Sequence, residues 1–519
     1  MTRSQLALSE NDAAGWEQLN RRSFAHSLRP VALPQRDGIP FWNRHARQFI
    51  MPPAFEIPVR PGAAGYRFSV TTPAGAPIAE FTADSPQEPL TAIWDRVPVG
   101  TVKLTVAALG RDGAVLPQPF EREFYRCAWF HGPYPSISHD YSAAARRCLA
   151  YIYGLPHVQG WLHGGTVDEK IYRKYCYPTK TLSAISRALL RHSDLSDDAQ
   201  VRANCLEIAC KMGDWLIDNS CPAGTPLEFL PPTYWKHATY HLAKPHIGQI
   251  MMIYPMVAGG MYLELHRRTG KARYLEAAIR LANTMGRLEL PDGSWYLVYC
   301  EDDGRPVVEN VVLITRTMME FLSGLSAATG DPSYAAMGGR ACKRLIDQNL
   351  RLWDWDGQFE DVIPQEMYKN LTKNHAHELA ASLMKQGQVK TALEIVDWSE
   401  DQFVVWSDPN PAIGTSMYPG GDKNNGMVMP TALEQYNCYW PVDASMSNFI
   451  SVWTKAYKCT GDNLYLEKAR AMADAILRNQ RPDGSIPTWF FDIDLPDWLN
   501  CMVYSAETLL ELADALHGR

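Results

Sequence analysis

The residues best suited to chemistry gather in six long polar segments of this chain of 519 residues. The segments cover residues 154–177, 220–244, 289–305, 352–368, 404–441 and 481–497. They combine Trp and Tyr, whose flat faces stack on sugar rings, with carboxylates, amides and imidazoles that bind hydroxyl groups. Long loops inside a compact domain are usually functional, so this mixture predicts a cleft for carbohydrate.

Three acids have positions that fit glycoside hydrolysis. That reaction needs a proton-donating carboxyl group and a second carboxylate. Glu360 and Asp361 precede one predicted helix, and Asp443 opens the next helix of the same kind. We therefore expect neighbouring helices to place one of the first two acids opposite Asp443. An N-cap role for Asp443 stays equally open, because Asp is common at that position.

A second set of residues fits β-elimination from a uronic acid. That chemistry needs a group that neutralises the carboxylate, together with His or Tyr as base and acid. Asn374 and His375 begin a predicted helix, and Tyr439 lies in the next long segment, with Tyr234 as another source of a phenol. A structural role for His375, as a hydrogen-bonded loop histidine, also stays open.

Nine side chains are candidates for contacts with the substrate, because they offer ring faces, imidazoles or amides. They are Trp161, His163, Tyr234, Trp235, His237, Asn370, Asn374, Trp440 and Trp489. Some of the aromatic ones are expected to pack the long segments onto the helices instead, since long loops also pack against themselves.

The sequence favours neither a metal nor a cofactor. His237 and His241 have the spacing that places two imidazoles on one helical face, but prolines flank them. The cysteines lack the paired spacing of zinc sites, so we expect no metal. Phosphate-binding glycine loops, nucleophile elbows and dinucleotide fingerprints are missing from the sequence, so no cofactor is expected.

Composition excludes several classes of partner. The net charge is −7 and no run of Lys or Arg stands out, which argues against nucleic acid. The longest apolar run, residues 250–265, is too short to span a membrane. The N-terminus has no signal-peptide pattern and the 11 cysteines are scattered, so we expect a cytoplasmic protein, or a secreted one whose signal has been removed.

A repeated pattern predicts the helices that carry these segments. TGKARYLEAAIRL, from Thr269, returns as TGDNLYLEKARAM, from Thr460, and in a weaker form as TGDPSYAAMGGRA, from Thr329. Each copy places Gly where a helix C-cap needs a left-handed residue, and each leads through an amphipathic helix to an Asp-Gly turn. These turns lie at Asp292-Gly293, Asp356-Gly357 and Asp483-Gly484.

The predicted helices are of two kinds. Residues 465–480, after a short connector, are charged on one face, as expected for an outer helix. Residues 245–267, 311–328 and 443–457, after long segments, are small or apolar nearly all round, as expected for inner helices. Six such pairs predict a mainly α fold, an (α/α)6 barrel. All long segments then lie on one rim, at the positive N-terminal ends of the inner helices.

A different pattern precedes the helices. Residues 51–128 contain short runs, some with apolar–polar alternation, separated by Gly, Pro and Asp, which predicts a small β-sandwich similar to fibronectin- or immunoglobulin-like modules. We expect an N-terminal arm over 1–50, the β-sandwich over 51–135 and the barrel over 136–519. Three roles stay open for the β-domain, namely shaping the cleft, forming a homodimer and bracing the barrel.

Residues 139–516, with the repeated TGD…YL…A…DGS pattern, resemble the six-hairpin carbohydrate-active enzymes. These are glycoside hydrolases and polysaccharide lyases with an (α/α)6 toroid, some with a β-domain in front. Asn374-His375 is similar to the Asn-His pair of toroid uronate lyases. The resemblance implies a glycosidase that uses paired carboxylates on oligo- or polysaccharides, with uronic acids among the candidate sugars. The alternatives are a uronate lyase and a carbohydrate-binding protein without catalysis, since a fold alone does not decide function.

Overall fold

The structure is a computed structural model that describes part of the chain. The described residues are 48–49, 52–55, 57–126, 138–168, 177–241, 243–307, 312–313, 316–350, 373–405, 430–435, 438–489 and 497–518. For residues 48, 312–313, 316, 373–375, 401–402, 405, 433–435 and 438–441 it describes the backbone alone.

Twelve helices of 13–20 residues follow residue 138 in the described ranges. Five hairpins pair α4 (Pro178–Leu195) with α5 (Ala199–Asp218), α6 (Ile253–Thr269) with α7 (Ala272–Leu288), α8 (Arg316–Thr329) with α9 (Pro332–Arg344), α10 (Lys373–Lys385) with α11 (Val389–Phe403), and α12 (Asp443–Thr460) with α13 (Asn463–Asn479). The sixth pair joins the two ends of this region, α2 (Tyr141–Gly154) and α14 (Leu499–Leu516).

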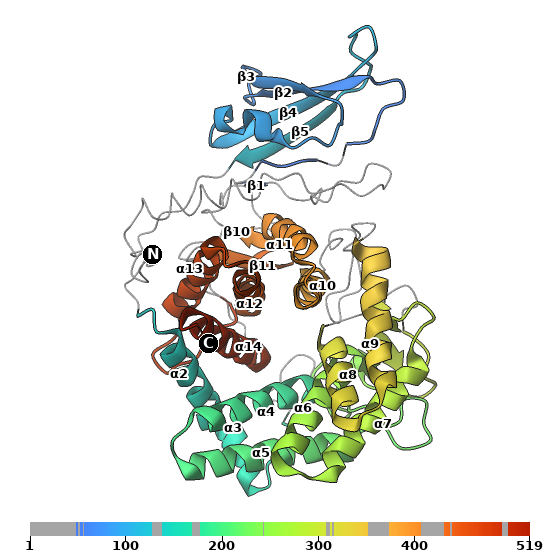
Figure 1. Cartoon of the computed structure of the whole chain (residues 1–519), viewed down its shortest axis with the longest axis vertical. Coiled ribbons are helices and arrows are strands. Elements are labelled where there is room, and N and C mark those ends of the chain that lie inside the picture. The colour runs from blue at the N-terminus through green and yellow to red at the C-terminus, as the bar shows by residue number, and fades with distance from the viewer. Residues whose placement is uncertain are drawn as a thin grey trace.

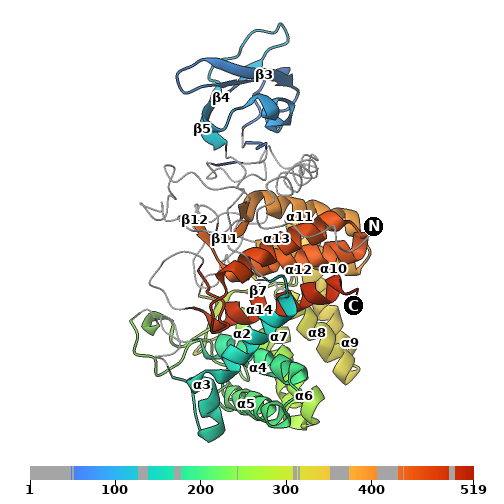
Figure 2. The same cartoon turned by 90° about the vertical axis from the view of Figure 1, so that its left-hand side faces the viewer.

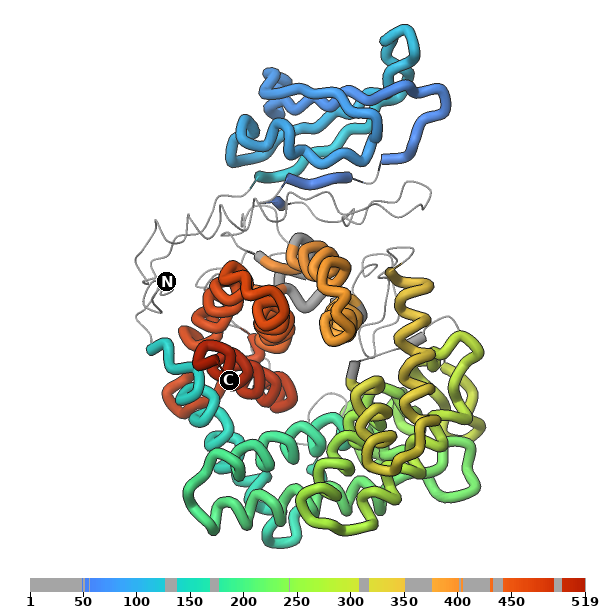
Figure 3. Tube along the Cα trace, in the orientation of Figure 1, coloured from blue at the N-terminus to red at the C-terminus, as the bar shows by residue number. Residues whose placement is uncertain are grey.

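The helices that follow the long segments form a closed inner ring. Contacts run from α4 to α6, α8, α10, α12 and α14, and α14 returns to α4. Helices α5, α7, α9, α11, α13 and α2 lie outside this ring (Figures 1 and 3). This is the arrangement of an (α/α)6 barrel, which the alternation of short and long connectors predicted.

The short connectors end the inner helices in the same way. Gly270, Gly330 and Gly461 have φ values of 67°, 74° and 70°. Each Gly N–H donates to the carbonyl four residues earlier, with N–O distances of 2.7–2.8 Å. This left-handed cap, which other residues adopt less readily, is the one predicted from the repeat.

Two of the three predicted Asp-Gly turns lie in the described residues, and they also agree. The Asp292 carboxylate accepts from the Ser294 N–H at 3.0 Å, and Asp483 accepts from the Ser485 N–H at 2.9 Å. A Cβ added at Gly484 would lie 2.6 Å from the carbonyl oxygen of Arg147 on α2, so the turn packs directly on an outer helix. Asp356-Gly357 lies outside the described residues.

Small residues allow the inner helices to approach closely. A Cβ at Gly259 on α6 would lie 2.6 Å from the ring of Phe321 on α8. The largest hydrophobic cluster runs through all twelve helices, with Tyr262, Trp398 and Trp453 almost fully buried. Packing of this kind stabilises the walls of the ring rather than filling its axis.

In the described residues, the segment before the helices shows a single sheet and not the two sheets of the predicted β-sandwich. Its described residues form one five-stranded sheet in the order β1 (Gln48–Phe49), β5 (Phe120–Arg126), β4 (Gly100–Leu109), β2 (Gly65–Thr71) and β3 (Pro77–Ala83). All its pairs are antiparallel except β1 with β5. Figures 1 and 2 both show the sheet at one end of the molecule.

One segment accounts for the difference from the predicted β-sandwich. Residues 91–97 (TAIWDRV), one of the short runs on which the β-sandwich prediction rests, belong largely to the 3₁₀ helix η2 (Leu90–Arg96). Its buried Leu90, Ile93 and Trp94 have the spacing of one helical face, and Trp94 stacks on Phe124 of β5 at 6.1 Å. A helical turn therefore covers the sheet. The predicted domain limits at 50/51 and 135/136 fall outside the described residues and stay predictions.

Candidate functional site

A cavity of about 640 Å³ follows the axis of the helix ring. All six inner helices contribute to its wall. Its polar lining residues are Lys180, Arg187, Tyr254, Glu264, Thr317, Glu320, His377, Glu378, Asn448, Ser451, Lys455, Asn500, Tyr504 and Glu507. The volume is in the range of small-molecule sites, and polar groups that converge between apolar walls are what such sites contain.

Lys180 lies in the first turn of α4 and is only 6% exposed. Its Nζ lies 4.6 Å from the ring centre of Trp498, 5.2 Å from that of Tyr177 and 5.6 Å from that of Tyr254. We call these three rings the aromatic cage. A cation over aromatic faces is attracted by their electron-rich centres, which offsets part of the cost of its burial.

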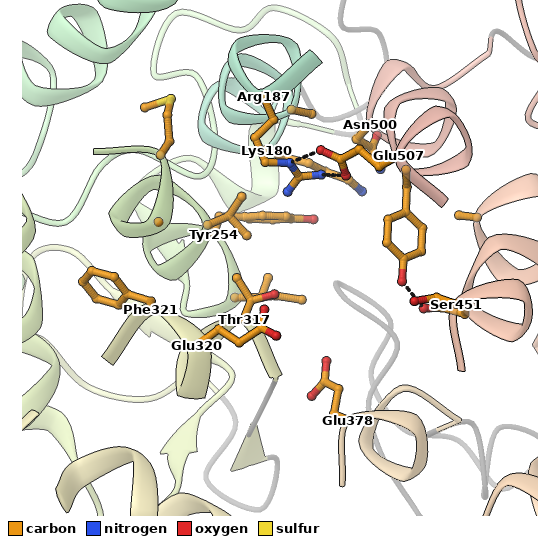
Figure 4. Close-up of a pocket in the computed structure, with 18 of the residues that line it drawn as sticks. Lys180, Arg187, Tyr254, Thr317, Glu320, Phe321, Glu378, Ser451, Asn500 and Glu507 are labelled. Carbon is orange, nitrogen blue, oxygen red and sulfur yellow. Dashed lines mark hydrogen bonds and ion pairs between the residues drawn. The ribbon is translucent and has the colours of Figure 1, made fainter. Parts of the chain in front are cut away.

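Glu378 and His377 come from the middle of α10. Figure 4 shows the Glu378 side chain directed into the cavity, and its Oε2 is shielded from solvent. His377 is held against the next helix, because its Nε2 lies 2.7 Å from the Ser399 hydroxyl and its ring meets Phe449 edge-on at 4.6 Å. The histidine therefore fixes α10 while its neighbour presents a carboxylate.

Further along the axis, polar side chains bind each other across α12 and α14. The Lys455 ammonium donates to Glu511 at 2.8 Å, and the Ser451 hydroxyl donates to the other oxygen of that carboxylate at 2.8 Å. The Tyr504 hydroxyl donates to the Asn448 amide oxygen, also at 2.8 Å. These bonds hold the side chains of the wall in fixed orientations.

The far end of the cavity is also charged. Burial opposes ionisation of Glu264, but the hydrogen bonds from Arg267 and Arg268 outweigh it, so the pKa of this carboxyl lies below its ordinary value. Glu264 is therefore a fixed negative charge committed to two arginines rather than a proton donor.

A carboxyl with the opposite tendency lies on the long-segment side. Burial, with a smaller effect of Asp302, raises the pKa of Glu301, which is the direction that a proton donor needs. The Glu301 N–H donates to Gly248 beside β6 (Gln249–Met251), which leads into α6. Glu301 is not among the residues that line the axial cavity.

Four outer helices have an acidic N-cap, whereas the outer helices α7 and α11 have Lys271 and Gln388 there and no side-chain capping bond. Asp140, Asp198, Asp331 and Asp462 cap the outer helices α2, α5, α9 and α13 with their side chains. Tyr177, Met252, Val442 and Trp498 hold the N-cap positions of the inner helices α4, α6, α12 and α14, and none of these four makes a side-chain capping bond. At α4, α6, α12 and α14, where the structure describes the N-cap, the mouth of the cavity thus has positively polarised helix ends without acidic caps.

Asp443, a predicted catalytic acid, lies behind the cavity wall. It is fully buried as the first residue of α12, where Val442 holds the N-cap position. Its carboxylate accepts from the Ser505 hydroxyl on α14 at 2.8 Å. The neighbouring residue Ala444 lines the cavity instead. Asp443 therefore does not face the cavity, as the expected pairing with Glu360 or Asp361 requires.

Two aromatic residues predicted to bind substrate pack behind the site instead. Tyr234 is buried and packs on Tyr177 at 5.3 Å and on His246 at 5.1 Å. The Trp489 ring lies 6.4 Å from Trp498. Because Tyr177 and Trp498 belong to the aromatic cage, Tyr234 and Trp489 support the rings that surround Lys180.

Other predicted residues lie elsewhere on the described chain. Trp161 is buried in the helical core, and His163 is exposed. Trp235 packs on Trp215 at 5.2 Å, with His237 against its edge. His237 and His241 lie in turns, so they do not share a helical face.

The remaining predictions are not decided by side-chain positions. Asn374 and His375 belong to α10, and Tyr439 and Trp440 to β12 (Cys438–Pro441), all by backbone alone. Glu360, Asp361 and Asn370 lie outside the described residues.

Sequence reasoning missed most of the axial residues. Three pairs, Lys180 with Arg187, Asn448 with Lys455 and Asn500 with Glu507, are seven residues apart on inner helices. Residues seven apart lie on nearly the same face of a helix, so a polar pair at that spacing marks the side that faces the axis.

Two further properties concern the described residues alone. They contain no group of three or more His, Cys, Asp or Glu side chains arranged to hold a metal ion. None of the helices described is long and apolar enough to cross a membrane.

Searches against known proteins give distant structural likenesses. No family model matches the chain, and no curated protein matches its sequence. A D-mannose isomerase is 11% identical, with a TM-score of 0.49 over 74% of this chain and 100% of that one. Cellobiose 2-epimerase from Spirochaeta thermophila is 12% identical, with a TM-score of 0.44 over 66% and 86% of the two chains.

A third solved structure is the GH76 α-mannanase BT2949 of Bacteroides thetaiotaomicron. It is 12% identical, with a TM-score of 0.44 over 73% of this chain and 96% of that one. Likenesses at this level leave the reaction open, and the ring of hairpins follows from the helix contacts themselves.

Proposed function

We propose that this chain is a carbohydrate-processing enzyme that hydrolyses glycosidic bonds in its axial cavity. The observation that carries the proposal is Glu378, whose carboxylate extends from α10 into a cavity lined by all six inner helices (Figure 4). In this proposal Glu378 exchanges the proton with the glycosidic oxygen, as one carboxyl of a glycosidase pair does.

The second carboxylate has a described candidate. Glu320 of α8 lines the same cavity, and α8 and α10 are neighbours in the ring. Its Oε1 lies 3.5 Å from the Lys385 ammonium. Glu360 and Asp361 stay alternative sources for this group.

The cavity mouth supports a sugar ligand. Tyr254 offers a ring face, Asn500 an amide and Thr317 a hydroxyl, each from the first residues of an inner helix. A stacking surface beside hydrogen-bonding groups suits a molecule with apolar ring faces and polar edges.

A second candidate reaction is β-elimination from a uronate. It is favoured by Lys180, a cation that can neutralise a carboxylate, and by Tyr254 and Tyr504, phenols that line the same cavity. Asn374, His375 and Tyr439, the predicted lyase residues, stay part of this alternative.

The test is incubation of the purified protein with a panel of neutral and uronate-containing oligosaccharides. Hydrolysis is expected to release products with saturated reducing ends, which chromatography detects. Ultraviolet-absorbing unsaturated uronates would show elimination instead. Binding without any cleavage would favour a non-catalytic carbohydrate-binding protein, and isomerisation of a sugar without bond cleavage would contradict both cleavage reactions.

A further inference from the structure

We infer that the deep half of the axial cavity is a subsite for the terminal unit of a sugar chain, and that Gly260 keeps this subsite open. The deep half is the part lined by Arg187, Leu190, Glu264, Ser451, Lys455 and Glu507. The inference rests on the proposed function for the cleavage itself, and on the shape of the cavity for the position of the cleaved bond. It narrows the activity to bonds at chain ends, as opposed to bonds inside a polymer.

The first step is the depth of the cavity beyond the two proposed acids. Glu320 is the fifth residue of α8 and Glu378 the sixth residue of α10. Helical side chains lean toward the N-terminal end of their helix, which here is the mouth. The lining continues along α4 to Leu190 and along α12 to Lys455, each near the end of its helix. About seven further residues at about 1.5 Å each give roughly 10 Å of cavity beyond the acids.

The second step is that the deep half is entered from the mouth. Each described inner helix contacts the next all the way round the ring, so a sugar chain cannot leave sideways between them. At the inner end, Arg187 of α4 and Glu507 of α14 form a bidentate ion pair (Figure 4). Both also line a second cavity of about 370 Å³, which continues toward the ends of α4 and α6. These side chains separate the two cavities, so a chain that enters at the mouth ends inside the ring.

The third step is the chemistry of the deep half. Its charged groups are paired within the protein, since Arg187 binds Glu507 and Lys455 binds Glu511. Glu264 accepts hydrogen bonds from two arginines of its own helix. A guanidinium has five N–H groups and Arg187 donates two of them to Glu507, so it can also bind a hydroxyl group. Polar groups whose charges already cancel suit the hydroxyls of an uncharged sugar unit.

The fourth step is Gly260, which lines the cavity between Tyr254 at the mouth and Glu264 in the deep half. A Cβ added to Gly260 would meet no described atom within 4 Å, so this position faces open space. At the neighbouring Gly259 a Cβ would lie 2.6 Å from the Phe321 ring, so that glycine allows α6 to pack on α8. No such contact requires Gly260, although glycine destabilises a helix. Free volume on the way to the deep half accounts for it.

The experiment follows the products formed from cellohexaose, mannohexaose, xylohexaose and hexagalacturonate at low conversion. Action at chain ends is expected to give one short product and one shortened chain, and to release reducing ends from the matching polysaccharide without a fall in viscosity. Gly260→Leu should raise KM for the cleaved hexasaccharide, and weaken its binding in titration calorimetry, by about tenfold or more. The added side chain takes the space of the terminal unit, and excess atoms in a filled site cost free energy of that order. Gly260→Ala should act in the same direction with a smaller effect.

The matched control is Gly339→Leu on the outer helix α9. This glycine is exposed, an added Cβ there also meets no described atom within 4 Å, and it is not among the residues that line the axial cavity. The control should leave KM and binding unchanged.

Three results would overturn the subsite while hydrolysis stands. These are early products of many lengths, tighter binding of hexagalacturonate than of every neutral chain, and a folded Gly260→Leu protein with wild-type KM and binding. Hexasaccharide binding that Gly260→Leu weakens, without any cleavage, would overturn the proposed hydrolysis alone. Neither binding nor cleavage of any chain would overturn both. If Gly260→Leu does not fold, the wild-type products and Gly260→Ala decide the question.

Discussion

Arg187 on α4 and Glu507 on α14 join the two ends of the inner ring. The Arg187 Nε and Nη2 donate to Oε1 and Oε2 of Glu507 at 3.1 and 3.2 Å (Figure 4). Because α4 is the first inner helix in the chain and α14 the last, this bidentate ion pair lies where the ring closes. Both residues also line the axial cavity, so ring closure and the shape of the site depend on the same contact.

We predict that Arg187→Met lowers the free energy of unfolding by about 1 kcal/mol, because the pair is partly exposed but bidentate. It should also weaken substrate binding, because Glu507 in the cavity wall would no longer be held in one orientation by Arg187. Chemical denaturation and KM measure the two effects. Arg267→Met, which removes a more exposed partner of Glu264, is the control. Equal effects of the two substitutions would contradict a role in ring closure.

Glu378→Gln tests the proposed reaction directly. The substitution keeps the shape of the side chain but removes proton transfer, so kcat should fall by about 10²- to 10⁴-fold with a small change in KM. Glu276→Gln, on the exposed face of α7, should leave kcat unchanged. Steady-state rates on the substrate found in the panel decide the matter, and an active Glu378→Gln enzyme would remove Glu378 from the mechanism.

Asp443→Asn tests the acid predicted from the sequence. The carboxylate is buried and accepts from Ser505, so the substitution should lower the free energy of unfolding by about 1–3 kcal/mol and leave kcat close to wild type. Ser505→Ala should show a similar loss, and the double variant should lose less than the sum. A large fall in kcat with unchanged stability would instead support the catalytic role.

Lys468 of α13 and Glu400 of α11 form a buried ion pair at 2.6 Å, with 0% and 2% of their side chains exposed. Lys468→Met should lower the free energy of unfolding by about 3–5 kcal/mol, because it leaves a buried carboxylate without its cation. The double variant Lys468→Met, Glu400→Gln should recover part of this loss. Lys343→Met, in the exposed pair with Asp347, should have a much smaller effect in the same denaturation experiment.

Asp194 predicts a dependence of stability on pH. The hydrogen bonds from Arg268 hold the pKa of the Asp194 carboxyl below its ordinary value of 3.8, despite partial burial. The folded state therefore binds the proton less tightly than the unfolded state. The stabilisation is present above the unfolded pKa and is lost as pH falls through the lower, folded pKa.

Asp194→Asn should consequently be less stable than wild type near neutral pH, and the two proteins should converge below about pH 4. Unfolding measured across this pH range tests the prediction, with the exposed Asp197→Asn as control. A stability difference that persists undiminished in acid would show that the Arg268 contact does not act through ionisation.

The helices were predictable because their signals are local. Gly270, Gly330 and Gly461 each end a helix in the left-handed conformation. In the described Asp-Gly turns, the Asp carboxylate accepts a hydrogen bond from the N–H two residues later. Residues 91–97 show the limit of such signals. A short apolar run is compatible with a strand and with a helical turn. In the folded protein this run forms a helical turn, in which Trp94 packs against Phe124.

The sequence by itself determined the pairing of helices, the rim that the long segments share and the kinds of group on it. Only the tertiary structure decided which residues face the axis. Adjacent helical residues point about 100° apart, so Asp443 turns toward Ser505 while Ala444 lines the cavity. Lys180 became a candidate for the same reason, because its three rings come from different parts of the chain and meet only in the folded ring.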